Sequence, residues 1–411
     1  MRTAASDSSQ SSHHVLLAVT TSHLFNHLSM TVMSFLILTL AAKELGLDTV
    51  QVGLLSATAQ LTSGIFQLFW ALLSNFLRKN FIMGLGNALQ AISGAMAVTV
   101  KGFTDVLTLR FLWGIGSAPQ HPVASSLISE NYHAERRGLA LSIHMGFAYI
   151  GNMVGPLMAT YLAMNFGWRM AFLLIGLPQL VLAAFFLGMM RNEPHHMASQ
   201  HISQNECMVI LRHTLKSLLN PDLLLVNVSQ VLVTAARGLN LWITYLPMYL
   251  VQVKRFDIET SALVVSAFLA AGTVGTLLFG YLGNPTQKLL LASLSTLFTS
   301  LSLIYLGVIG LSGFPLILML IAIGFVSLEV VVSLQSYLAE ISDNTYRNMA
   351  FGVFFTLGFV AASFWTTVIG YVIQCYGFNT AFILMGCVSL PAAIAMNVLR
   401  LLQRKPTYSN H

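Results

Sequence analysis

Apolar residues fill most of the chain in long runs, and short polar stretches separate these runs. A helix needs about 20 mostly apolar residues to cross the hydrocarbon core of a bilayer. Twelve such spans can be placed, at residues 15–42, 51–76, 80–102, 105–128, 138–163, 169–190, 221–251, 259–283, 288–309, 314–340, 348–375 and 377–401. The pattern predicts an all-α membrane protein with twelve transmembrane helices.

A longer polar stretch divides the predicted spans into two sets of six. We expect a polar N-terminus at 1–14, a six-helix bundle at 15–190, a central loop at 191–220, a second bundle at 221–401 and a tail at 402–411. No small-residue cleavage site follows the polar N-terminus, so the first apolar run is expected to be retained as a span rather than removed as a signal peptide.

Composition supports the membrane assignment, because 56% of the residues are hydrophobic and only 8% are charged. Soluble domains average about 25% charged residues. The net charge of +6 comes from bases scattered at predicted helix ends, which does not favour nucleic-acid binding. The three cysteines show no paired spacing, so no disulfide framework and no cysteine metal site are expected.

The orientation follows from the distribution of Lys and Arg, which accumulate on the cytoplasmic side of membrane proteins. With both termini placed inside, thirteen of these residues fall on the cytoplasmic side and five on the outer side. We therefore expect both termini to be cytoplasmic, in a bacterial inner membrane.

The two sets of spans share sequence at a constant offset. "GWRMAFLLIG" at 167–176 matches "GFNTAFILMG" at 377–386 with an offset of 210. "GLDTVQVGLL" at 46–55 falls beside "RFDIETSALV" at 255–264 with an offset of 209. These matches predict an internal duplication, the parallel-repeat arrangement found in transporters of alternating access.

Five segments resemble motifs of the major facilitator superfamily. They are "RFLWGIG" (110–116), "ERRGLALS" (135–142), "GFAYIGNMVGP" (146–156), "GWRMAF" (167–172) and "ARGLNLWITYLPMY" (236–249). The nearest branches are fosmidomycin resistance, drug efflux and organic-anion transport. The resemblance implies two pseudo-symmetric six-helix bundles and a solute site lined by the first and seventh helices.

The loop between the second and third spans departs from the family pattern. "ALLSNFLRKN" (71–80) has Ala71 and Asn75 where the family has Gly and Asp. The loss of that carboxylate puts the family's charge-latched gating in doubt.

Two ionisable residues fall within the fourth predicted span. Arg110 and His121 are eleven residues apart, so on a continuous helix they would lie about 20° apart on one face. Ionisable side chains within a membrane face the protein interior or a water-filled cavity. The resemblance implies a role for Arg110 in proton coupling or solute contact, and a structural bond to carbonyls of a neighbouring helix is the alternative.

The offset between the two repeats aligns Glu329 with His121. Glu329 is the only acidic residue deep within any predicted span. A carboxyl group in a low-dielectric cavity can hold and release a proton near neutral pH. We therefore predict that Glu329 is the proton-coupling acid, with a structural ion pair to Arg237 or Arg110 as the alternative. The predicted proton-coupling set is Glu329, Arg110, His121 and His144.

Arg237 is the best anion ligand in the sequence, because a guanidinium binds carboxylate or phosphate through paired hydrogen bonds. The other candidates are polar residues on predicted spans, although networks that only pack helices would use the same residue types. The predicted solute-binding set is Arg237, His23, Asn26, His27, Gln120, Tyr149, Asn152, Gln230 and Asn240.

His23 and His27 have the i, i+4 spacing of a metal-binding pair. No carboxylate or cysteine accompanies them in the same segment, so no metal site is predicted there. His195, His196 and His201 are interpreted as part of a solvated loop. No phosphate-binding glycine loop and no enzyme site are found, and no cofactor is expected.

The sequence therefore favours a monomeric, proton-coupled secondary transporter of a small anionic or amphiphilic organic solute. Three alternatives stay open. They are a drug-efflux antiporter, a transporter of metal chelates, and a non-transporting membrane receptor on the same fold.

Overall fold

The structure is a computed structural model of the whole chain. It describes residues 2–74, 76–132, 134–189, 220–281, 285–342 and 347–403. These ranges are helical and contain no β-strand. The predicted central loop lies outside the described residues, and the described part of the predicted N-terminus belongs to the first helix.

The described residues form two compact units, which are considered separately. The first unit contains residues 2–189 together with Arg255–Ser266. Its elements are α1 (Arg2–Leu36), the π-helix η1 (Ile37–Ala41), α2 (Ala42–Leu45), α3 (Thr49–Leu73), α4 (Lys79–Met96), the 3-10 helix η2 (Ala97–Thr99), α5 (Phe103–Ser117), the 3-10 helix η3 (Ala118–Gln120), α6 (Pro122–Asn131) and α7 (Ala134–Met189).

The second unit contains the described residues of 220–254 and 267–403. The helix α11 has its first turns in the first unit and the rest in the second. The elements from residue 221 onward are α9 (Pro221–Arg237), α10 (Leu239–Met248), the π-helix η5 (Tyr249–Val253), α11 (Ile258–Tyr281), α12 (Pro285–Ile309), α13 (Gly313–Ser327), α14 (Val330–Ile341) and α15 (Arg347–Gln403).

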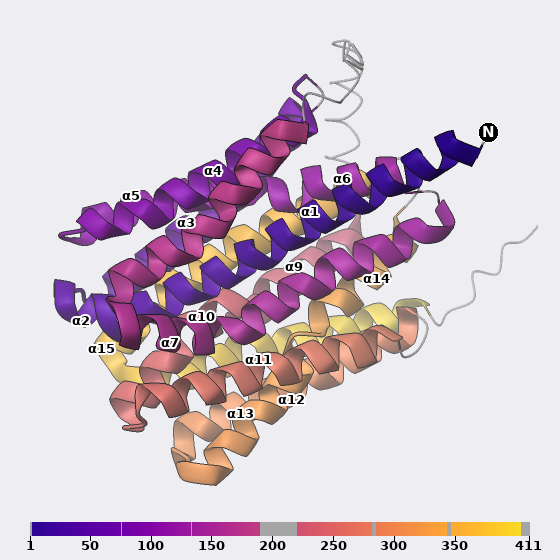
Figure 1. Cartoon of the computed structure of the whole chain (residues 1–411). Coiled ribbons are helices and arrows are strands. Elements are labelled where there is room, and N and C mark those ends of the chain that lie inside the picture. The colour runs from indigo at the N-terminus through magenta and orange to yellow at the C-terminus, as the bar shows by residue number, and fades with distance from the viewer. Residues whose placement is uncertain are drawn as a thin grey trace, which may run out of the picture. The chain divides into compact units, whose positions relative to one another are not determined.

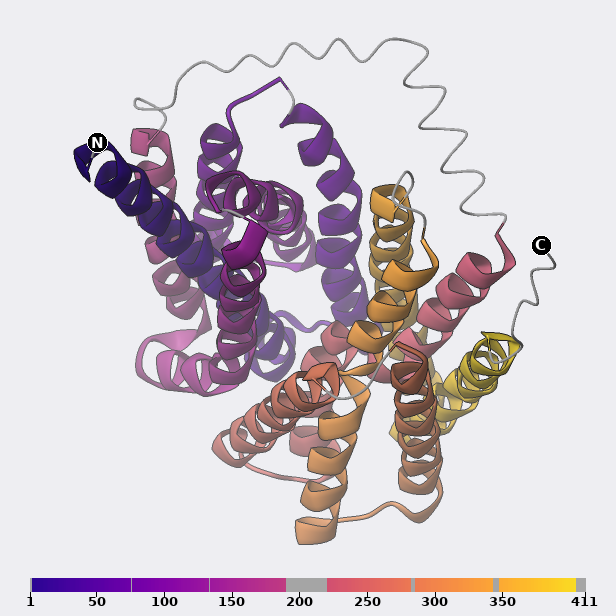
Figure 2. The ribbon, with the colours of Figure 1, turned by 90° about the vertical axis from the view of Figure 1, so that its right-hand side faces the viewer.

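Packing within each unit follows a comparable plan. In the first unit, α1 and α4 lie against α7, and α5 lies against α3 and α4 (Figure 1). In the second unit, α9 and α12 lie against α15, and α12 also lies against α13 and α14 (Figure 2, rose through orange to yellow). Because the long helices α7 and α15 occupy matching places, the packing agrees with the duplication in the sequence.

Two glycines mark the same turn in both units. Gly167 inside α7 has φ 78° and ψ 159°, and Gly377 inside α15 has φ 81° and ψ 172°. Each lies where two predicted spans meet. Residues that carry a Cβ atom rarely adopt a positive φ. The matched segments "GWRMAF" and "GFNTAF" thus begin with a residue whose backbone conformation only glycine adopts easily.

The fourth predicted span is not one continuous helix. The 3-10 helix η3 separates α5 from α6, with Pro119 inside η3 and Pro122 as the first residue of α6. Proline lacks the N–H that a continuous helix requires and clashes with the preceding turn. The helix is thus interrupted between Arg110 and His121, and both side chains lie against α1, Arg110 at Ser34 and His121 at His23.

The corresponding helix of the second unit is broken at the corresponding place. The helix α13 ends at Ser327, α14 begins at Val330, and Glu329 is the N-cap of α14. His121 is likewise the N-cap of α6. The predicted correspondence of His121 with Glu329 thus reappears as two ionisable residues at matching helix breaks.

Nine helices of the described ranges are long and apolar enough to cross a membrane. They do not correspond one to one to the twelve predicted spans. The helices α7 and α15 each contain two predicted spans joined at a glycine, and residues 103–131 are interrupted by η3.

Matching aspartates begin the second helix of each repeat. Asp48 caps α3 by accepting from the backbone N–H of Gln51 at 2.8 Å. Asp257 precedes α11 and accepts from the backbone N–H and the hydroxyl of Thr260, at 2.7 and 2.8 Å. These two hydrogen bonds lower the pKa of Asp257, so the cap is retained at neutral pH.

Close helix crossings in the first unit depend on glycine. A Cβ atom at Gly116 would lie 2.5 Å from the carbonyl oxygen of Gly86 and 2.9 Å from the Cβ of Leu89. Neither atom is the end of a flexible side chain, so α4 and α5 can approach this closely only if residue 116 has no side chain.

We expect Gly116→Ala to lower the stability of the protein by about 1–3 kcal/mol, the usual cost of overpacking. The measurement is the thermal unfolding of the purified protein in detergent, followed by tryptophan fluorescence. Gly146→Ala is the matched control, because a Cβ there meets nothing within 4 Å. An unchanged unfolding midpoint in Gly116→Ala would contradict the close crossing.

Candidate functional site

Four histidines of the first unit form one cluster. His23 and His27 come from α1, His121 from the break before α6, and His144 from α7. The ring centroid of His23 lies 4.7 Å from that of His27, 5.2 Å from that of His121 and 4.1 Å from that of His144. The structure thus brings together four predicted site residues that the sequence placed on three separate spans.

Hydrogen bonds fix the orientation of the rings. The Nδ1 of His23 lies 3.1 Å from the carbonyl oxygen of His144, and the Nδ1 of His27 lies 3.2 Å from the Oδ1 of Asn152. The Nε2 atoms of His23 and His27 face each other at 3.1 Å. His144 Nε2 lies 3.3 Å from the carbonyl oxygen of Gln120.

Close packing of α1 on α7 creates this arrangement. A Cβ at Gly151 would lie 2.5 Å from the carbonyl oxygen of Leu24, and one at Gly155 would lie 2.5 Å from the Thr31 side chain. These glycines let α7 approach α1 so closely that Asn152 can reach His27. The face of α7 that carries these two glycines therefore packs against α1.

A buried hydroxyl connects this cluster to its surroundings. Gln120 donates to Ser22 Oγ at 2.6 Å, and Ser22 donates to Asn87 Oδ1 at 3.0 Å. All three side chains are fully buried. The network holds Gln120, the residue before His121, against α1 and α4. The side-chain amide of Gln120 is therefore hydrogen-bonded within the protein.

Arg110 lies elsewhere in the first unit and bridges three helices. Its Nε donates to the carbonyl oxygen of Leu55 in α3, and its Nη2 to Ser34 Oγ in α1, both at 3.3 Å. The guanidinium carbon lies 5.4 Å from the centre of the Trp113 ring. The side chain is fully buried, and this geometry matches the structural alternative considered for Arg110.

Glu329 is fully buried in the second unit. Its Oε2 accepts a hydrogen bond from Ser333 Oγ at 2.6 Å, and Ser295 also hydrogen-bonds to the carboxyl group, with smaller contributions from the charges of Arg237 and Lys288. The predicted carboxylate therefore lies deep in the protein and within the field of two cations.

Arg237 is the last residue of α9, and Gly238 separates α9 from α10. Its Nη2 donates to Gln230 Oε1 at 3.0 Å, so two predicted solute-binding residues are in contact. Arg237 remains partly exposed. The seventh predicted span is thus a broken helix, and broken helices are where many transporters bind their solutes.

A small pocket beside Arg237 is rich in hydroxyl groups. Three of its hydroxyls, those of Thr296, Thr299 and Ser327, are buried and have no hydrogen-bond partner among the described residues. Its lining consists of Val233, Ala236, Arg237, Thr296, Thr299, Ser327, Val330 and Ser389. The sequence interpretation missed these hydroxyls, because single Ser and Thr residues on an apolar helix carry no distinctive spacing.

Two predicted asparagines are buried with unused polar atoms. Both amide atoms of Asn240 and the Oδ1 of Asn26 lack a partner in the described part of the chain. Buried amides are normally hydrogen-bonded, so these groups are available to a solute or a water molecule. Tyr149 is partly exposed on α7.

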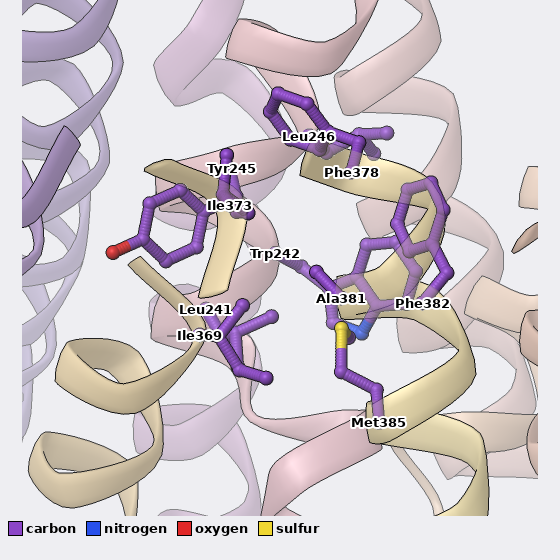
Figure 3. Close-up of a pocket in the computed structure, with 10 residues that line it drawn as sticks. All are labelled: Leu241, Trp242, Tyr245, Leu246, Ile369, Ile373, Phe378, Ala381, Phe382 and Met385. Carbon is purple, nitrogen blue, oxygen red and sulfur yellow. The ribbon is translucent and has the colours of Figure 1, made fainter. Parts of the chain in front are cut away.

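A second, apolar pocket lies between α10 and α15 (Figure 3). Trp242, Phe382 and Met385 face it, and Tyr245 donates its hydroxyl to the carbonyl oxygen of Thr366 at 2.7 Å. Its apolar lining offers no group that would select a charged solute. The hydroxyl-lined pocket beside Arg237 is therefore the better candidate for the solute-binding site.

We expect Ser22→Ala to destabilise the protein by about 2 kcal/mol or more, because it removes a partner from two buried amides. The unfolding midpoint in detergent measures this loss. The control is Thr108→Ala, since this exposed hydroxyl donates to the carbonyl oxygen of Thr104 within its own helix. Equal midpoints for the two variants would contradict the role of the network.

The comparisons with known proteins agree with this architecture. The family model described as Major Facilitator Superfamily matches residues 19–366. The chain is 24% identical over 372 residues to the probable L-galactonate transporter of Escherichia coli (strain K12), covering 86% of this chain and 82% of that protein. It is also 24% identical over 332 residues to the probable galactarate/D-glucarate transporter GarP of the same strain, covering 72% and 74%.

A third relative is the probable sulfoacetate transporter SauU of Cupriavidus necator (strain ATCC 17699), 26% identical over 271 residues, with 61% of this chain and 60% of that protein covered. Among solved structures, a bacterial homolog of the human lysosomal transporter Spinster matches with a TM-score of 0.77 and 15% identity, covering 95% of this chain and 97% of that one.

These matches and the helical architecture confirm the predicted fold class, and they indicate a transporter rather than an enzyme. The chain belongs to the Major Facilitator Superfamily and is a multi-pass membrane transporter of small solutes.

Proposed function

We propose that this protein transports a small polyhydroxylated organic anion, such as a sugar acid, in symport with protons. One observation carries the proposal: a partly exposed guanidinium, Arg237, borders a pocket with three buried hydroxyls that have no partner within the described ranges. A sugar acid offers a carboxylate for the guanidinium and hydroxyls for Thr296, Thr299 and Ser327. The names of the relatives support this chemistry, because they describe carriers of sugar acids and of a sulfonate.

The anion would be recognised at the break between α9 and α10. The guanidinium of Arg237 presents paired donors, and Gln230 orients it by accepting from Nη2. Asn240 lies two residues after Gly238, and neither of its amide atoms has a partner in the part of the chain that the structure describes, so it can bind a hydroxyl or the carboxylate of the same solute. These relations favour the organic-anion branch of the superfamily over drug efflux.

Glu329 is proposed as the proton carrier. The charges of Arg237 and Lys288 act on its carboxyl group, so the arrival of an anion at Arg237 would change the field around Glu329. Binding of the anion and of the proton are thereby coupled through one guanidinium. The proton-coupling roles expected of Arg110, His121 and His144 stay predictions, as do the solute contacts expected in the first unit.

We further infer that the protein works as a monomer in the bacterial cytoplasmic membrane with both termini on the cytoplasmic side. The distribution of Lys and Arg along the sequence supports this orientation.

We expect Arg237→Gln to raise the KM for L-galactonate about tenfold to a hundredfold, because a charge-assisted hydrogen bond contributes about 1.5–3 kcal/mol. Uptake of labelled L-galactonate, D-glucarate and sulfoacetate into proteoliposomes gives the measurement. Lys101→Gln, at an exposed position, is the matched loss of a positive charge. Unaltered KM values in Arg237→Gln for every transported anion would remove Arg237 from solute binding.

We expect Glu329→Gln to abolish accumulation driven by an inward proton gradient while exchange of labelled for unlabelled solute continues. An amide cannot cycle a proton, but it keeps the size and hydrogen bonding of the carboxyl group. Glu340→Gln on the same helix α14 is the control, because that side chain is exposed. Gradient-driven accumulation that survives in Glu329→Gln rejects the assignment, and a wild-type protein without any flux would favour a receptor.

A further inference from the structure

We propose that His23, His27 and His121 form a binding site for one divalent transition-metal ion. The site lies wholly in the first unit and does not use the hydroxyl-lined pocket of the second. It differs from the expectation drawn from the sequence, in which the pair His23 and His27 had no third ligand.

The hydrogen bonds of His23 and His27 determine which ring nitrogens carry protons. A carbonyl oxygen only accepts, so the Nδ1 of His23, at 3.1 Å from the carbonyl oxygen of His144, is the protonated nitrogen of that ring. Asn152 Oδ1 accepts from Thr31 Oγ1 at 3.1 Å and from the Nδ1 of His27 at 3.2 Å. In both neutral rings, the Nε2 atom is therefore an unprotonated acceptor.

These two acceptors lie 3.1 Å apart. Two lone pairs at this distance repel each other unless a cation lies beside them. A metal ion meets this need, because ring nitrogens bind zinc at about 2.0–2.1 Å, which places neighbouring ligands of a tetrahedral site about 3.4 Å apart. The observed separation is close to that value.

His121 supplies the third ligand. The candidate ligand atoms of His23, His27 and His121 all lie within 4.8 Å of one another. Closing the longest of these separations to that of a tetrahedral site needs a side-chain shift of about 1.4 Å. His121 precedes Pro122 at the break between η3 and α6, so its ring projects from a helix end. Three imidazoles with no oxygen ligand favour Zn²⁺, Co²⁺, Ni²⁺ or Cu²⁺ over Mg²⁺ or Ca²⁺.

The surroundings have the features of a metal site. Metal-binding histidines usually donate their second ring nitrogen to an oxygen, which fixes the ring and the tautomer. The carbonyl oxygen of His144 and Asn152 Oδ1 serve this purpose for His23 and His27. His23 is fully buried, whereas His27 and His121 are partly exposed, which leaves a route for the ion and a position for a fourth ligand.

The test uses the full chain, purified in detergent through a tag that contains no histidine and stripped with a chelator. Cobalt(II) is the probe, because its visible absorption reports imidazole coordination, and Zn²⁺ is the silent competitor. We expect one Co²⁺ per chain, displaced by one equivalent of Zn²⁺. His27→Gln and His121→Gln should each weaken binding at least tenfold, and Asn152→Leu about tenfold to a hundredfold through its effect on His27.

The matched control replaces three histidines of the central segment together, as His195→Ala, His196→Ala and His201→Ala. This variant should keep the cobalt spectrum, and the unfolding midpoint of each variant in metal-free buffer verifies folding. A wild-type protein that binds no stoichiometric Co²⁺ overturns the proposal and indicates that the two Nε2 atoms share a proton. Unchanged binding in both His27→Gln and His121→Gln overturns it as well. Because no organic solute is present, the result is independent of the proposed anion transport.

Discussion

The structure depends on one constraint: a polar or ionisable group at membrane depth must find its partner inside the protein. Lipid offers no hydrogen bonds, and an unpaired group costs several kcal/mol. Arg110 meets this constraint through two of its nitrogens, Nε with Leu55 and Nη2 with Ser34, and Ser22 joins two buried amides. The groups that do not meet it, such as the hydroxyls beside Arg237, are the ones best placed to bind a solute.

The duplication explains where the chemistry lies. In both repeats the fourth helix breaks at the same place, and an ionisable residue occupies the N-cap position of the following segment: His121 before α6 and Glu329 before α14. A break frees backbone groups, which at membrane depth are tolerated only where protein or a cavity surrounds them. The two copies then differ in side chains, with imidazoles in the first and a carboxyl group near a guanidinium in the second.

This division of chemistry makes the two sites separable. The pocket at Arg237 is lined by hydroxyls and a cation, which suits a polyhydroxylated anion. The histidine cluster presents neutral nitrogen ligands, which suit a soft or borderline cation. Each proposal rests on groups within a single compact unit, so evidence for one neither requires nor excludes the other.

The sequence by itself determined the membrane class, the duplication and the requirement that Arg110, His121, Arg237 and Glu329 face the protein interior. The lengths of the apolar runs and the constant offset between matching segments are properties of the sequence itself, so they can be recognised without the fold. Only the tertiary structure decided which residues meet. His23 and His144 are 121 positions apart, and their contact depends on glycine packing of α7 on α1. The structure also decided that the helix is interrupted after Ser117 and that Arg110 and His121, on either side of the interruption, both lie against α1.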